Sequence, residues 1–156
     1  MPDMLVPLLM LPESKPLIEE LRVDGIAIRP AHPFEMTRLR AFIEEHFSAA
    51  WADEAVTGLF NKPVTTLIAV EDKKIVGFGS YECTRRDYFG PTGVAESHRG
   101  RNIGKALLIA CLEGLRDMGY AYAIIGGAGP VDFYAKCVNA SVIPEAGRGI
   151  YTDMLG

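Results

Sequence analysis

The sequence is poor in the residues that mark several large protein classes. It has only 3 cysteines among 156 residues, and no two of them lie close together. Cys83, Cys111 and Cys137 fall in expected strands or helices, which favours reduced core residues of a cytoplasmic protein over a disulfide framework. No group of His, Cys and Asp has the spacing of metal ligands, so we expect no metal.

A strong charge and a long apolar run are also missing. The net charge is −4, and a mildly acidic chain argues against general nucleic-acid binding. Residues 1–12 are apolar, but they lack a basic region, carry Asp3 and are interrupted by Pro7 and Pro12. This run is too short to span a bilayer, so we expect neither a signal peptide nor a membrane partner.

The apolar start of the chain still needs a buried surface. We expect residues 1–24 to form an N-terminal extension packed on the domain or on a second subunit. A homodimer would cover its apolar side chains, which are Met4, Leu5, Leu8, Leu9 and Leu11.

What the sequence does contain is a glycine-bracketed basic loop, VAESHRGRNIGKA, at Val94–Ala106. It lies between a strand-like run and an apolar helical run. Gly100, Gly104 and Asn102 allow a tight turn, because glycine and asparagine adopt a positive φ more readily than other residues. The helix that follows presents free N–H groups at its start, and these groups attract phosphate oxygens. The loop therefore predicts a pyrophosphate-binding turn.

Two common nucleotide loops do not fit these residues. A Walker A loop, G-x-x-x-x-G-K-[ST], needs a hydroxyl after its lysine, but Lys105 is followed by Ala106 and the glycine spacing is shorter. A dinucleotide fingerprint needs G-x-G-x-x-G directly after a strand, and that spacing is absent.

The loop instead resembles the acyl-coenzyme A loop of the GNAT acetyltransferases, Arg/Gln-x-x-Gly-x-Gly/Ala. Arg101, Gly104 and Ala106 fit this motif, whereas Asn102 stands where a glycine is common. The resemblance implies acetyl-CoA as the acyl-donor cosubstrate. The residues that it implies at the acetyl-CoA site are Val94, Arg99, Gly100, Arg101, Asn102, Ile103, Gly104, Lys105 and Ala106.

The expected order of elements has the same resemblance, over residues 25–156. It runs strand, two helices, antiparallel strands, helix, strand, helix and two strands. The last two strands, residues 141–143 and 150–154, are expected to form a closing hairpin. The family resemblance implies an α/β fold of the α+β type, with a mixed, mostly antiparallel central sheet that is flanked by helices and splayed at the acyl-CoA site.

The helix at 131–138 carries the residue that we expect to be catalytic. It resembles the family's last helix, where a tyrosine protonates the leaving thiolate, and this implies that role for Tyr134. An unperturbed tyrosine has a higher pKa than a thiol, so it is still protonated when the thiolate forms. Val94 and its neighbours would pair their backbone with the pantetheine arm and polarise the thioester carbonyl.

The general base and the acceptor stay open. Residues near the expected site that could act as the base are Glu82, Asp87, Glu44, Glu45 and His46. Phe47 and Trp51 could line an acceptor pocket, although their helical spacing also suits a core. The hypothesis is transfer of an acetyl group to a primary amine of a small molecule or peptide. The alternatives are a non-catalytic acyl-CoA-binding or sensor domain, and an interaction module assembled through the N-terminus.

Overall fold

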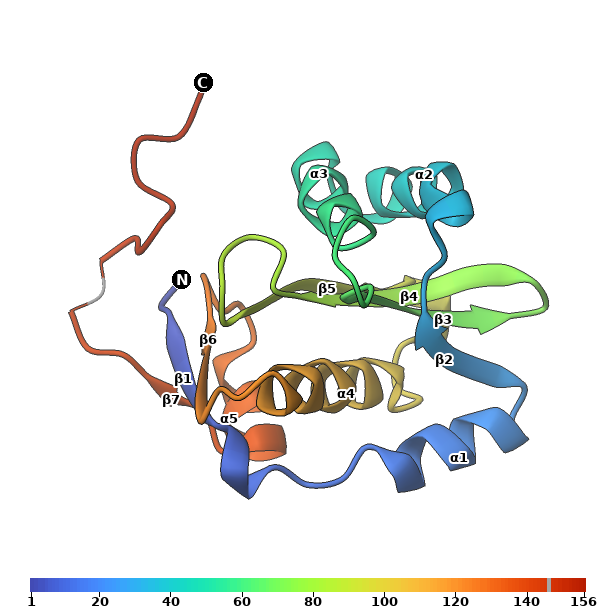
Figure 1. Cartoon of the computed structure of the whole chain (residues 1–156), viewed down its shortest axis with the longest axis horizontal. Coiled ribbons are helices and arrows are strands. Elements are labelled where there is room, and N and C mark those ends of the chain that lie inside the picture. The colour runs from blue at the N-terminus through green and yellow to red at the C-terminus, as the bar shows by residue number, and fades with distance from the viewer. Residues whose placement is uncertain (146) are drawn as a thin grey trace.

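The computed structural model describes residues 1–145 and 147–156 (Figure 1). One seven-stranded sheet organises the chain, in the order β2-β3-β4-β5-β6-β1-β7. The strands are β1 (Met4–Pro7), β2 (Ile26–Pro30), β3 (Thr66–Glu71), β4 (Lys74–Tyr81), β5 (Tyr88–Val94), β6 (Tyr122–Ile125) and β7 (Ser141–Val142). Within the described residues, only β5 and β6 pair in parallel, and the other neighbouring strands are antiparallel. The expected mixed, mostly antiparallel sheet is confirmed.

Helices cover both faces of this sheet. They are α1 (Lys15–Val23), α2 (Met36–His46), α3 (Ala49–Thr57), α4 (Ile103–Asp117) and α5 (Val131–Val138), with short 3-10 turns at Leu8–Met10, Pro33–Glu35 and Glu96–His98. Figure 1 shows α2 and α3 on one face, and α1 and α4 on the other. In the part of the chain that the structure describes, no helix is long and apolar enough to cross a membrane.

Two apolar cores follow from this layering. The larger one surrounds α4, whose buried side chains include Leu107, Cys111 and Leu115, each fully shielded from solvent. α4 is buried on most sides because apolar residues occupy more than one of its faces, as its sequence predicts. The smaller core joins α2 and α3 to β3 and β4 around Phe78. Cys83 and Cys137 are half-buried rather than core residues.

The N-terminal segment is part of the sheet itself. β1 lies between β6 and β7 and pairs with both in the antiparallel sense, with Leu5 opposite Ile124 on one side and Ser141 on the other. Met4 and Val6 are fully buried. The domain's own strands, with α4 and α5, therefore cover Met4, Val6 and Leu8, whereas Leu9 and Met10 are exposed.

The expected closing hairpin is wrong. β7 pairs with β1, and residues 150–154 form no strand. Asp153 has a φ of 56°, which interrupts the extended backbone that a strand there would need. β1 occupies the position beside β7 and brings two fully buried side chains, whereas Thr152, Asp153 and Met154 are exposed. The turn of the expected hairpin includes Ala146, which lies outside the described residues.

Candidate functional site

A gap between the two parallel strands creates the main cavity. β5 and β6 pair only at Tyr88–Ile124 and Phe89–Ile125. Beyond these pairs, β5 continues along β4 as far as Val94, while the chain after β6 leaves the sheet. A cavity of about 820 Å³ opens where the strands diverge, and residues of β5, α3, α5 and the loop after β6 line it.

The N-terminal segment holds the loop after β6 away from β5. The carbonyl oxygen of Pro2 accepts a hydrogen bond from Ala128 N at 2.7 Å, and Asp3 Oδ1 accepts one from Gly127 N at 2.8 Å. Asp3 is buried, so this carboxylate is fixed within the protein. The bonds to Pro2 and Asp3 direct the loop toward β1, and β5 is left with an open edge facing the cavity.

A second cavity of about 480 Å³ lies at the start of α4, and Val94, Gly104 and Phe133 line both cavities. Asn102 precedes α4 with a φ of 65°, and Gly100 has a φ of 78°, as the loop sequence predicts. The N–H groups of Ile103, Gly104 and Lys105 donate no hydrogen bond within the described residues. These donors are free for an anion, and the positive end of the helix dipole adds to the attraction.

Basic side chains line this second cavity. They are His98, Arg99, Lys105 and Lys136, and no Asp or Glu is among the lining residues. Arg99 is held in place because its Nε donates to the carbonyl oxygen of Val94 at 3.3 Å. Four basic residues beside free N–H groups suit a ligand with several phosphate charges better than a neutral one.

Seven of the nine residues expected at the phosphate loop line this cavity, and two do not. Arg101 is directed toward Glu71, with 3.6 Å between Nη1 and Oε2, and Ala106 is fully buried in the core. Glu71 also contacts His98 through Oε1 and Nε2 at 2.8 Å. The bond to His98, with a smaller effect of Arg101, lowers the pKa of the Glu71 carboxyl below its ordinary value. Glu71, at the end of β3, thus anchors the loop from two points.

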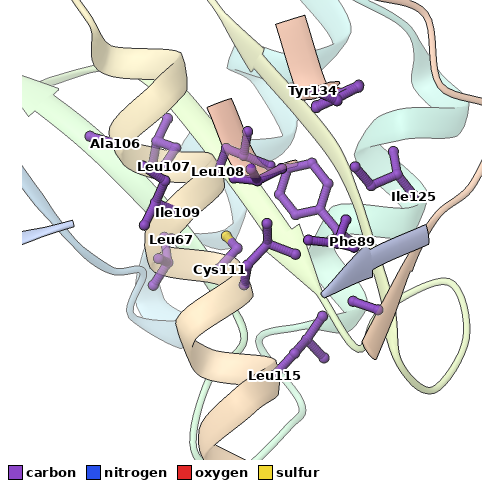
Figure 2. Close-up of a cluster of buried hydrophobic side chains, with 14 of the residues drawn as sticks. Leu67, Phe89, Ala106, Leu107, Leu108, Ile109, Cys111, Leu115, Ile125 and Tyr134 are labelled. Carbon is purple, nitrogen blue, oxygen red and sulfur yellow. The ribbon is translucent and has the colours of Figure 1, made fainter. Parts of the chain in front are cut away.

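Tyr134 lines the larger cavity from α5. Its side chain is only 6% exposed and packs edge-on against Phe89, with 6.3 Å between ring centroids. Figure 2 shows both residues with Ile125 in the apolar cluster beside α4. This burial raises the pKa of Tyr134 to about 12, so the hydroxyl stays protonated at neutral pH. It makes no hydrogen bond to the described residues, which leaves it free for a ligand.

The carboxylates considered as a base lie elsewhere. Glu82 accepts hydrogen bonds from the Tyr120 hydroxyl at 2.9 Å and from Asp87 N at 2.6 Å. Burial, and then the nearby Glu82 charge, raises the pKa of Asp87 to about 6. Neither residue lines either cavity, and the same is true of the other three residues considered, Glu44, Glu45 and His46.

The sequence reasoning missed one acidic residue of the site. Glu54 of α3 lines the larger cavity, as does Trp51 one helical turn earlier. Their spacing of three residues places both on one face of a helix, but the sequence does not show that this face of α3 lines the cavity. Phe47 does not line the cavity but stacks on Trp51, with ring centroids 5.4 Å apart. Among residues 1–145 and 147–156, no cluster of His, Cys, Asp and Glu could hold a metal ion.

Comparisons with known proteins agree with this architecture. A GCN5-related glucosamine N-acetyltransferase region of a fungal multi-domain β-N-acetylglucosaminidase has a TM-score of 0.72 at 16% identity, covering 91% of this chain and 19% of that one. A GCN5-related N-acetyltransferase from Sphaerobacter thermophilus has a TM-score of 0.68 at 22% identity, covering 91% of this chain and 48% of that one. This chain therefore spans less than half the length of either protein.

A third structure was determined with its ligand. It is a GNAT family acetyltransferase from Brucella melitensis in complex with acetyl-CoA, with a TM-score of 0.55 at 21% identity, covering 71% of this chain and 80% of that one. At these identities the likeness concerns the fold. No curated protein matches the sequence. The model of the Acetyltransferase (GNAT) family matches residues 21–137, which is most of the chain, so this protein belongs to the GNAT acetyltransferase family.

Proposed function

We propose that this protein is an N-acetyltransferase that moves the acetyl group of acetyl-CoA to a primary amine of a small molecule or peptide. One observation carries the proposal: the two cavities adjoin through Val94, Gly104 and Phe133. A long ligand can therefore lie with its phosphates at the start of α4 and its thioester near Tyr134. Family membership, and the acetyl-CoA complex of the Brucella protein, support the same donor.

The donor end uses the free N–H groups of Ile103, Gly104 and Lys105 to bind pyrophosphate oxygens, with the basic side chains as further partners. The open edge of β5, from Gly90 to Val94, offers backbone groups to the amide-rich pantetheine arm, in the manner of an added strand. A backbone N–H of this edge stabilises the oxyanion that develops on the thioester carbonyl.

Tyr134 serves the leaving group. As the amine nitrogen bonds to the carbonyl carbon, the carbon–sulfur bond breaks and the electron pair stays on sulfur. Tyr134 donates its hydroxyl proton to that thiolate. The nitrogen releases one proton to solvent water and becomes an amide, and the tyrosinate takes a proton back from water. The pKa of about 12 in the free protein keeps the proton available throughout the neutral range. No residue is assigned as the base in this scheme.

Calorimetric titration of the purified protein with acetyl-CoA is the direct test, with ATP–Mg²⁺ and NAD as controls. We expect saturable binding of acetyl-CoA that weakens in Gly104→Glu, because the new carboxylate would face the phosphate site. With about 5 Å between charges, one repulsion amounts to roughly 1–3 kcal/mol at intermediate dielectric. Absent binding, or a preference for ATP, would contradict the proposal, and the role of Tyr134 would be lost with it.

A further inference from the structure

The larger cavity contains one carboxylate, and this group is already oriented. Among the described residues, Glu54 is the only Asp or Glu that lines it. The Thr84 hydroxyl donates a hydrogen bond to Glu54 Oε2, which fixes the carboxylate from the β4–β5 turn. The other oxygen, Oε1, accepts no hydrogen bond within the described part of the chain. Glu54 is half-buried, so its free oxygen is partly shielded from water.

Aromatic side chains accompany this carboxylate. Trp51, Tyr88 and Tyr151 line the same cavity. Burial raises the pKa of Tyr151, and the charge of Glu54 raises it further. Trp51 is held from behind by Phe47, and Phe47 in turn packs on the fully buried Phe78 at 5.8 Å. A carboxylate beside supported aromatic rings is a setting that favours an organic cation.

The two ends of the combined site differ in charge. The cavity at α4 is lined by His98, Arg99, Lys105 and Lys136 and has no acidic lining residue, whereas Glu54 lies in the larger cavity. Arg148 is the basic side chain that lines the larger cavity, and it forms no ion pair with Glu54 in the described structure. The end at α4 therefore favours an anionic ligand. The larger cavity has one carboxylate and one basic side chain, and the unbonded oxygen of its carboxylate can still contact a cation.

We infer that Glu54 binds the acceptor as an alkylammonium ion, with Trp51 and Tyr151 against its carbon chain, and that the reacting nitrogen releases its extra proton to water before it attacks the thioester. The acceptor class is then an amine that is protonated at neutral pH, rather than an aromatic amine or an alcohol. The identification of the bound cation as the acetyl acceptor rests on the proposed function. The binding of the cation itself depends only on the cavity.

The single tryptophan gives a direct measurement, because Trp51 is the only tryptophan in the sequence and lines the cavity. Its fluorescence is followed while 1,5-diaminopentane is added to the full-length protein, both saturated with CoA and without CoA. The uncharged probe 1-pentanol is titrated in parallel. The variant Glu54→Gln removes the charge at nearly constant shape. Asp53→Asn is the matched control, since it removes one carboxylate from the same helix at a residue that does not line the cavity.

We expect 1,5-diaminopentane to bind the wild-type protein and Asp53→Asn alike, and to bind Glu54→Gln about 10- to 100-fold more weakly, as the loss of a charged hydrogen bond implies. Thr84→Val should give a smaller loss, because the carboxylate remains but is no longer oriented. Binding of 1-pentanol should be equally weak in all variants. Thermal melts establish that each variant is folded.

Equal affinity of Glu54→Gln and the wild type would overturn the inference, as would an affinity for 1-pentanol that matches that for the diamine, or no binding of the diamine to the wild type. A different result, the absence of acetyl-CoA binding in calorimetry, would contradict the proposed function. Titration without CoA keeps the two results distinct.

Discussion

Gly104→Ala should separate the stability of the fold from the affinity of the donor site. Gly104 is the second residue of α4, in ordinary helical backbone, and it lines both cavities. A Cβ built at this position would meet only Val94 Cγ2, at 3.6 Å, which is an ordinary van der Waals contact. The protein therefore has room for the methyl group, and the methyl group would occupy part of the proposed phosphate site.

The two expected effects have opposite signs. Alanine is favoured over glycine by about 0.5–1 kcal/mol inside a helix, so the variant should be unchanged or more stable by up to about that amount. The same methyl group keeps a phosphate oxygen from the N–H of Gly104. Loss of one hydrogen bond to a charged oxygen costs about 1.5–3 kcal/mol, which corresponds to roughly 10- to 100-fold weaker binding of acetyl-CoA.

Urea denaturation and calorimetric titration of the same preparation provide both quantities. The reasoning is refuted if acetyl-CoA binds Gly104→Ala as tightly as the wild type, because the phosphate site would then lie elsewhere. A variant that loses stability and affinity together would also refute it, since Gly104 would then be required by the fold. Gly104→Glu, measured in parallel, should bind acetyl-CoA more weakly than Gly104→Ala.

Two further predictions concern titratable groups. Tyr134→Phe removes a hydroxyl that has no partner among the described residues, so the stability of the fold and the affinity for acetyl-CoA should not change. Thiol release in the presence of an accepted amine should fall about 100-fold or more. Unchanged thiol release would exclude Tyr134 as the acid. Asp87 has a pKa of about 6, raised by burial and by Glu82, and its Oδ1 is buried without a partner. The folded state thus favours the protonated carboxyl of Asp87. Its contribution to the stability of the fold is complete below the unfolded pKa near 4 and is lost as the pH rises through 6. Asp87→Asn should therefore be more stable than the wild type at pH 7, by about 1 kcal/mol after allowance for partial exposure, and should lose this advantage at pH 4. Urea denaturation at both pH values measures it, and an equal difference at the two pH values would contradict the assigned titration.

The turn before α4 was predictable because its information is local. Gly100, Asn102 and Gly104 lie within five consecutive residues. Gly100 and Asn102 have the positive φ that their residue types suggest, and Gly104 leaves open space at the start of α4. The spacing of apolar residues predicts the helix that follows. The side chain of Arg101 was less predictable, because its partner Glu71 is 30 positions earlier in the chain and the pair exists only once β3 reaches the loop.

Contacts between distant segments explain the features that the sequence did not predict. Residues 141–143 and 150–154 look like a hairpin when only neighbours are considered, but β1 arrives from the opposite end of the chain and pairs with β7. In the sequence Glu54 resembles any exposed helical carboxylate. In the structure Thr84, 30 residues later, fixes its orientation, and the loop after β6 lines the same cavity. Neither fact has a signature in spacing or composition.

The position of β1 connects the first residues of the chain to the chemistry of the site. A cavity at the divergence of β5 and β6 requires that the chain after β6 be held away from β5, since two parallel strands would otherwise continue to pair. The carbonyl of Pro2 and the buried carboxylate of Asp3 provide that hold at Ala128 and Gly127. A side chain at Gly149 would collide with Asp3, so the C-terminal segment also closes around this carboxylate. Because Gly127, Ala128 and Tyr151 line the larger cavity, the N-terminal strand shapes the site from its far wall, even though it lies outside the stretch that matches the family.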